Sequence, residues 1–307
     1  MPSYIELDKN GSIPGSSPVG TVILSVNHGQ LTLTDNNVNP NQPAYTTVVR
    51  SLYPSASLAE TWGTYTVNYL KQKSGYSPSE ILYALGICSD DVDAFTATGN
   101  LGQYPLSMQS LLGPFYCGGL AGYPFVGSVG FSAFASHITD TGSLFISCTP
   151  HIGVTVDGEA GYQYRKGQTA ISSNCGAVHG AVSLVTSDPN PPTQSNVPYD
   201  NENYELWKLA DIIYPYSASF SGSASENVMA ATSIIRDAGF NYIITNSGSF
   251  ASALGARKMY AIGGIFINPD YGYEGYVDIN QFQEFDPVAN QWNDLTEDYK
   301  NGLFAQR

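Results

Sequence analysis

Charged residues are scarce in this chain of 307 residues, where Asp, Glu, Lys and Arg together make up only 12%. Soluble domains usually carry about twice that share. The few charges are also unbalanced, with 26 acidic residues against 12 basic ones and a formal net charge of -14. Because no basic patch is available to neutralise phosphates, the composition disfavours binding of nucleic acid or of an anionic membrane. It suits a small neutral substrate better.

Long apolar runs are absent as well. No run of roughly 18 or more apolar residues occurs, so no transmembrane helix is expected. The first residues lack the basic and apolar segments of a signal peptide, which indicates a cytoplasmic protein, or a plastid protein if a transit peptide has been removed. Four cysteines are too few for a disulfide framework. We therefore expect a reducing compartment that leaves thiols available for a metal.

The chain divides into a short N-terminal part and a main domain. Residues 1–50 are rich in Gly, Pro, Asn and Thr and contain a strand-like run at 21–26. We predict that they form an extension packed on the domain of residues 51–307. In that domain, the apolar runs 81–87 and 143–148 are too short and continuous for surface helices and indicate buried strands. Because strand and helix signals alternate, the predicted fold class is α/β, a mostly parallel central sheet flanked by helices.

The periodicity of apolar residues predicts further elements. Helices are expected over residues 55–73, 175–184, 204–213 and 224–238, and strands over residues 241–245 and 259–267. The segment 113–136 is dense in glycine and aromatic residues. Such a density suggests that its backbone packs closely against a ligand or another chain.

Three residues, Cys88, His151 and Cys175, lie in segments that could hold a ligand in place. Two thiolates and one imidazole, with one coordination position left open, make the ligand set of a catalytic zinc. Asp90, two residues after Cys88, could accept a hydrogen bond from zinc-bound hydroxide or bind the metal itself. By spacing alone such residues are more often core residues than ligands, because long separations lack the specificity of a Cys-x-x-Cys motif.

The other cysteines and histidines have structural interpretations. Cys117 and Cys148 lie within apolar stretches, which favours core packing over metal binding. His179 shares a predicted helix face with Cys175 and could be a ligand, although a role beside a ligand or in the core is favoured. His137 could shuttle protons or make a structural hydrogen bond. His28 is expected in an exposed turn.

Three segments carry a resemblance to a known family. They are residues 74–91 (Ser-Gly-Tyr-Ser-Pro-Ser-Glu-Ile-Leu-Tyr-Ala-Leu-Gly-Ile-Cys-Ser-Asp-Asp), 150–158 (Pro-His-Ile-Gly-Val-Thr-Val-Asp-Gly) and 165–177 (Arg-Lys-Gly-Gln-Thr-Ala-Ile-Ser-Ser-Asn-Cys-Gly-Ala). Together they resemble the limiting-CO2-inducible B (LCIB) family, which is similar in fold and zinc site to the β-carbonic anhydrases. The resemblance spans residues 55–270 and includes the acidic, tyrosine-containing stretch 200–207.

The resemblance implies that Cys88, His151 and Cys175 are zinc ligands and that Asp90 is the active-site carboxylate. It implies a β-carbonic-anhydrase-like homodimer and a lyase, a carbonic anhydrase, in which zinc hydroxide attacks CO2 to give bicarbonate, with a role in CO2 concentration. Two alternatives stay open. One is a non-catalytic, CO2- or bicarbonate-responsive binding or scaffold protein of the same family, and the other is a zinc hydrolase of small carbonyl or sulfur substrates.

One position departs from the pattern of β-carbonic anhydrases. In their Cys-x-Asp-x-Arg motif the arginine pairs with the aspartate and keeps it off the zinc, whereas Val92 stands at that position here. Another cation must hold Asp90, or the aspartate closes the site. Arg165 is the predicted partner and second catalytic residue, and a solvent-facing turn residue is its other interpretation. The glycine-rich segment could supply an apolar CO2 pocket, with the candidates Phe115, Tyr116 and Phe131.

Overall fold

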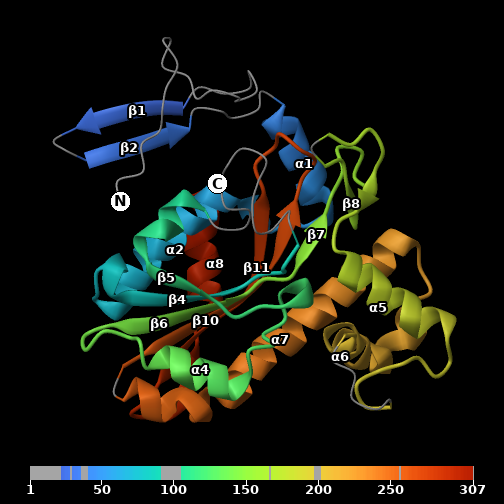
Figure 1. Ribbon diagram of the computed structural model, residues 1–307. Helices are drawn as coiled ribbons and strands as arrows, with labels where there is room; N and C mark the ends of the chain where they lie inside the picture. The colour runs from blue at the N-terminus through green and yellow to red at the C-terminus, as the bar shows by residue number, and fades with distance from the viewer. Residues whose placement is uncertain are drawn as a thin grey trace.

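A central sheet of eight strands organises the fold (Figure 1). The computed structural model describes residues 22–27, 30–35, 41–90, 105–165, 167–196, 202–255 and 257–306. The strands are β1 (Val22–Asn27), β2 (Gln30–Asp35), β3 (Ser57–Leu58), β4 (Ile81–Gly86), β5 (Leu112–Tyr116), β6 (Ser143–Cys148), β7 (His151–Gly153), β8 (Tyr162–Gln163), β9 (Ser172–Ser173), β10 (Met259–Asn268), β11 (Tyr276–Asp286) and β12 (Gln291–Asp294).

Helices account for most of the remaining described residues. The α-helices are α1 (Gln42–Leu52), α2 (Ala59–Ser74), α4 (Gly127–Ala135), α5 (Gly176–Ser187), α6 (Tyr204–Ile213), α7 (Ala224–Leu254) and α8 (Thr296–Phe304). Short 3-10 helices are η1 (Pro78–Glu80), η2 (Leu106–Ser110), η3 (Leu120–Gly122) and η4 (Tyr214–Ser219).

The order of strands along the sheet is β12-β11-β10-β6-β4-β5, with β3 beside β11 and β7 beside β10. The pairings of β4 with β5 and β6, and of β10 with β6 and β7, are parallel. Those of β11 with β10, β12 and β3 are antiparallel. The prediction of an α/β fold with a mostly parallel central sheet is therefore confirmed.

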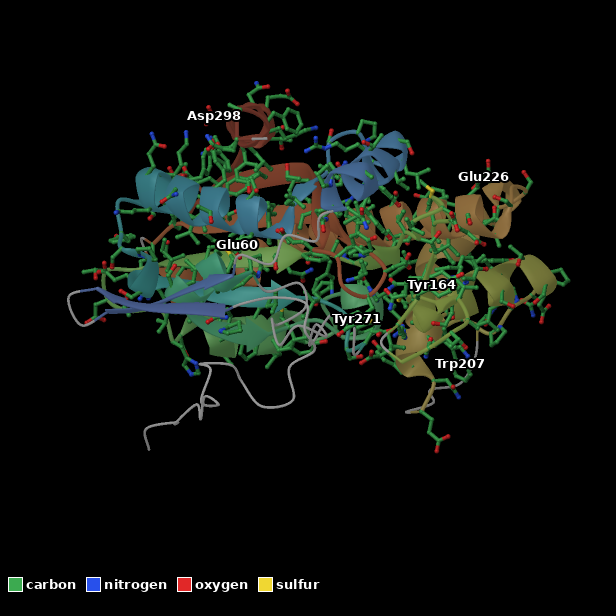
Figure 2. All side chains as sticks on the ribbon, turned by 90° about the horizontal axis from the view of Figure 1, so that it is seen from above. Glu60, Tyr164, Trp207, Glu226, Tyr271 and Asp298 are labelled. Atoms are coloured by element: carbon green, nitrogen blue, oxygen red, sulfur yellow. The ribbon has the colours of Figure 1, made fainter. Side chains whose placement is uncertain are left out.

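Both faces of the parallel strands are covered by helices, which explains their continuous apolar sequence. In β4, Ile81 and Tyr83 belong to the apolar cluster formed with α2 and α8, and Leu82 and Ala84 belong to the cluster formed with α4 and α7. Polar contacts also join α8 to α2. Asp298, labelled in Figure 2, accepts a hydrogen bond from Tyr69 and pairs with Lys73, each at 2.8 Å.

A third apolar cluster includes Ile265 and Ile267, in the carboxyl-terminal half of β10. It joins α1, α5, α6 and α7 to the residues that follow the parallel strands, and it contains both Cys88 and Cys175. In Figure 1, α5 and α6 lie together on one side of α7, next to β7 and β8. The candidate ligands are thus placed where helices meet the edge of the sheet.

Two sequence predictions are wrong, one in the type of element and one in where the element begins. The strand predicted over residues 241–245 lies inside the 31-residue helix α7. The helix predicted from residue 55 begins at Ala59, because Ser57 and Leu58 pair with β11 instead. The N-cap residue of α2 is Leu58, which makes no side-chain hydrogen bond to the helix.

The N-terminal part contains an antiparallel hairpin of β1 and β2, and β1 lies close to the strand-like run at 21–26. Helix α1 crosses residue 50, and its Tyr45 and Val49 are buried in the third apolar cluster. The division of the chain at residue 50 stays a prediction. Within the described residues, no helix combines the length and apolar character needed to cross a membrane.

Candidate metal centre

Cys88, His151 and Cys175 converge at one edge of the sheet, although they are far apart in the sequence. Cys88 lies two residues after β4, His151 begins β7 just beyond β6, and Cys175 precedes the first residue of α5. Strands β4 and β6 are parallel neighbours, so their carboxyl ends bring the following residues to the same edge. The candidate ligand atoms all lie within 4.8 Å of one another.

The donor set and its surroundings fit zinc. Thiolate and imidazole ligands favour this metal, and a tetrahedral zinc site separates its ligand atoms by about 3.5 Å. All three side chains are buried, with exposed fractions of 3% or less. The Cys175 thiol donates a hydrogen bond that lowers the pKa of the Cys88 thiol. The same bond, together with burial, raises the pKa of Cys175. The metal-free site therefore favours a thiolate at Cys88, and a bound divalent cation would favour thiolates at both Cys88 and Cys175.

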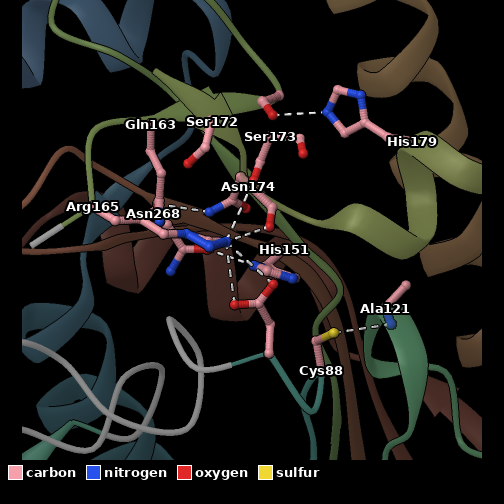
Figure 3. Close-up of polar contacts among 12 residues, drawn as sticks. Cys88, Ala121, His151, Gln163, Arg165, Ser172, Ser173, Asn174, His179 and Asn268 are labelled. Atoms are coloured by element: carbon pink, nitrogen blue, oxygen red, sulfur yellow. Dashed lines mark hydrogen bonds and ion pairs between the residues drawn. The ribbon is translucent and has the colours of Figure 1, made fainter. Parts of the chain in front are cut away.

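Asn268 orients the imidazole of His151. Their side chains are joined at 2.7 Å between Nδ1 and Oδ1 (Figure 3). Because an amide oxygen can only accept, Nδ1 carries the proton and Nε2 is the nitrogen suited to bind a metal. Asn268 is the last residue of β10, and it lies opposite Gly153 in the pairing of β7 with β10.

A tight turn supports Cys88 from the other side. The backbone N–H of Ala121, in η3, donates a hydrogen bond to the sulfur of Cys88 at 3.1 Å (Figure 3). Ala121 adopts a left-handed φ of 55°, which is unfavourable for a residue with a Cβ. The turn lies against β4 so closely that a Cβ on Gly118 would be 2.1 Å from the carbonyl oxygen of Ile87. The glycine-rich segment thus packs against the backbone that carries a ligand.

Arg165 lies beside Asp90 at the margin of the centre. Its Nη2 is 3.4 Å from each oxygen of the Asp90 carboxylate, and both side chains are mostly buried. The same nitrogen donates a hydrogen bond to the carbonyl of Asn174, the residue before Cys175, at 2.8 Å. Arg165 therefore connects the segments that carry the two cysteines. Val92 lies outside the described residues, and the roles of Asp90 and Arg165 in a reaction stay predictions.

The remaining cysteines and described histidines take structural places. Cys117 and Cys148 are buried in the apolar cluster between α4, α7 and the sheet, where burial raises the pKa of both thiols. His179 makes a hydrogen bond through Nε2 with the carbonyl of Gly161 at 2.8 Å. His137 is exposed at the end of α4. His28 lies outside the described residues.

The aromatic candidates for a CO2 pocket do not form one group. Phe131 is fully buried in the cluster of α4 and α7, and Phe115 stacks on Phe134 at 4.2 Å between ring centroids. Only Tyr116 reaches toward the centre, because its hydroxyl donates a hydrogen bond to the carbonyl of Ile87 at 2.9 Å. Phe115 and Phe131 pack the core because α4 covers that face of the sheet.

Sequence reasoning missed Asn268 and Ala121. Asn268 ends a long apolar run, so a polar residue directly after a buried strand is the signal that could have identified it. Ala121 acts through its backbone N–H, and no side-chain pattern marks such a residue.

Comparisons with known proteins agree with this arrangement. The model of the family described as limiting CO2-inducible proteins B/C beta carbonic anhydrases matches residues 59–286. The crystal structure of PtLCIB4, a homolog of the limiting CO2-inducible protein LCIB, is 26% identical, with a TM-score of 0.67; the match covers 81% of this chain and 98% of that chain. LCIB itself, at 15% identity and a TM-score of 0.56 over 80% of this chain and 95% of its own, shares the fold.

None of the curated proteins compared with the chain matches it. The family model nevertheless covers most of the chain, including all three candidate ligands, Asp90 and Arg165. The chain therefore belongs to the family of limiting CO2-inducible proteins B/C beta carbonic anhydrases.

Proposed function

We propose that this protein is a zinc-dependent carbonic anhydrase that interconverts CO2 and bicarbonate. The observation that carries the proposal is the buried cluster of two thiols and one imidazole, whose ligand atoms lie within 4.8 Å of one another. Membership of a family named for beta carbonic anhydrases supports the same reaction.

Cys88, His151 and Cys175 would hold the metal through three protein ligands. Zinc bound in this way lowers the pKa of a water at its open position to roughly 7, which supplies a nucleophile at neutral pH. The protein's own contribution is to fix the ligands: Asn268 holds the imidazole and the Ala121 N–H holds the Cys88 sulfur. Such hydrogen bonds would fix the orientation of the residues that hold the metal.

Asp90 would accept a hydrogen bond from the water or bicarbonate in the centre. A carboxylate so close to the ligands could also bind the metal and close the site. The guanidinium of Arg165 attracts Asp90 and is itself anchored on the carbonyl of Asn174. The contact supports the proposal, because Arg165 supplies a cation beside Asp90 although Val92 stands where β-carbonic anhydrases have arginine.

The surroundings of the centre suit CO2, which is small and carries no charge. Cys88 and Cys175 belong to an apolar cluster that also contains Tyr123, Ile152 and Val178. Such a lining excludes water and strengthens the few electrostatic interactions at the site.

Stopped-flow measurement of CO2 hydration tests the proposal. Zinc-loaded wild-type protein should accelerate hydration well above the buffer rate, and removal of zinc by a chelator or the change Cys88→Ala should abolish the acceleration. Cys117→Ala, which removes a buried thiol outside the centre, is the matched control and should stay active.

Arg165→Ala should retain zinc but lose roughly 100-fold in rate, because Asp90 is no longer held in place. A zinc-loaded wild-type protein no faster than buffer would reject the enzyme in favour of a binding or scaffold protein. Hydrolysis of small carbonyl or sulfur substrates faster than CO2 hydration would reject it in favour of a hydrolase.

A further inference from the structure

The first turn of α6 places a carboxylate beside the turn that supports Cys88. Glu205 lies in the first turn of α6, and its Oε2 accepts a hydrogen bond from the backbone N–H of Leu120 at 2.7 Å. Leu120 is the first residue of η3. Glu205 and Leu120 are 85 positions apart in the sequence, so this contact exists only in the folded protein.

Two successive N–H groups of this turn therefore point to two acceptors. Leu120 donates to the carboxylate of Glu205, and Ala121 donates to the sulfur of Cys88. Ala121 makes the second bond from a left-handed backbone, which an alanine rarely adopts unless its surroundings impose it. The hydrogen bond to Glu205, directly before Ala121, is such a constraint.

The contact with Glu205 depends on the absence of a side chain at Gly119. A Cβ at this position would lie 2.6 Å from Oε2 of Glu205 and 2.6 Å from a ring carbon of Phe125. Gly119 also donates its N–H to the carbonyl of Tyr123 and accepts that of Gly122, so the turn is closed on itself. The carboxylate of Glu205 thus occupies space that a side chain at position 119 would fill.

We propose that Glu205 is a positioning residue of the metal centre. By holding the N–H of Leu120, it fixes η3 so that the N–H of Ala121 is aimed at Cys88, where an N–H bond to a thiolate stabilises its negative charge. Glu205 thereby connects helix α6 to Cys88 indirectly, through the turn η3. The inference rests on the proposed metal site and does not depend on the reaction.

Metal binding by three variants tests this role. Glu205→Ala should weaken zinc affinity roughly tenfold, at the lower end of what partners outside the ligand set contribute, and should shift the thiolate-to-metal charge-transfer bands of the Co²⁺-loaded protein. Glu205→Gln retains an oxygen that accepts the N–H of Leu120 and should restore most of both properties. Asp211→Ala is the matched control, because Asp211 lies on the same helix but contacts Ser195 and Lys208.

Zinc affinity is measured by competition with a chelator, and thermal unfolding of the metal-free variants reports stability separately. Glu205→Asp, whose carboxylate is one methylene too short, should behave like Glu205→Ala and covers the case in which that variant does not fold. Unchanged affinity and spectra in Glu205→Ala or Glu205→Asp would overturn the inference, as would an equal loss in Asp211→Ala. Failure of the wild-type protein to bind zinc would instead overturn the proposed site. The zinc affinity and the Co²⁺ spectra do not depend on CO2 hydration, so loss of that activity alone leaves both measurements valid.

Discussion

At the scale of single residues, the charges of the proposed centre balance one another. The two thiolates of Cys88 and Cys175 would neutralise a divalent zinc, and the Asp90 carboxylate faces the Arg165 guanidinium. Burial makes an unbalanced charge costly, so each group requires its counterpart. Asn268 leaves this balance unchanged, because its amide orients His151 and is itself uncharged.

The change Asn268→Ala should weaken zinc binding by roughly 10- to 100-fold, since the imidazole loses the acceptor that fixes its orientation. Competition with a chelator measures the affinity. Asn268→Asp keeps an oxygen in the same place and should retain most of the binding. The account would be contradicted by wild-type affinity in Asn268→Ala.

A buried carboxylate near the centre predicts a pH-dependent stability. The two oxygens of Asp270 accept the N–H groups of Val156 and Tyr164, yet burial raises the pKa of this carboxyl above its ordinary value of 3.8. Since its folded pKa exceeds its unfolded one, its contribution to stability is present at low pH and is lost as the pH rises through the folded pKa. Asp270→Asn, which stays neutral, should therefore gain stability relative to wild type as the pH rises from below 3.8 to above it.

Urea unfolding of both proteins across this range checks the sign of the difference. A difference that stays constant with pH, or that falls, would show that the folded environment does not favour the neutral carboxyl of Asp270.

At the scale of elements, the site depends on close packing. The turn η3 and the glycines before it lie against the end of β4, next to Cys88. Gly118→Ala should lower the free energy of unfolding by about 1–3 kcal/mol, because its Cβ would overlap the carbonyl oxygen of Ile87. Gly176→Ala is the control, since nothing lies within 4 Å of its added Cβ. Chemical denaturation compares the two, and equal stability of both variants would contradict the close packing.

The elements that sequence predicted well are those whose local pattern matches their environment. Apolar runs such as residues 81–87 are strands because both faces of the sheet are covered. The run 241–245 contains two isoleucines and a threonine, which favour a strand, but Ile243 packs with Phe240 in the cluster between α7 and the sheet. Packing along α7 outweighs that local preference.

The residues of the site could likewise be predicted only where the local sequence marks them. The ligands and Asp90 lie in segments that carry the family resemblance, and Arg165 was found because cations are few in the matched region. Ala121 and Glu205 could not be found from the sequence, because their contacts to Cys88 and Leu120 join segments that only the folded chain brings together.

At the scale of the whole molecule, an exposed apolar surface borders the centre. Val156, Tyr164 and Tyr271 are each 37–46% exposed, and the N–H of Tyr271 donates to the carbonyl of Tyr164 at 2.9 Å, directly before Arg165. Tyr164 and Tyr271 are both labelled in Figure 2. A second copy of the chain covering this surface would shield the site from water, and the homodimer implied by the resemblance stays a prediction.

Sedimentation equilibrium should therefore give twice the mass of a single chain, and Tyr164→Lys should shift the protein toward the monomer by placing a charge in the contact. Tyr216→Lys, at an exposed tyrosine of η4, is the control and should leave the dimer intact. A wild-type protein that sediments as a monomer would contradict the prediction.

Cys88, His151 and Cys175 are proposed to form one zinc site, and X-ray absorption at the zinc edge examines its ligands. Spectra of the zinc-loaded protein should show two sulfur neighbours at roughly 2.3 Å and one imidazole nitrogen at roughly 2.0–2.1 Å. Cys88→Ala should leave a single sulfur, while Cys117→Ala should leave the spectrum unchanged. A wild-type spectrum with one sulfur neighbour or none would contradict the account.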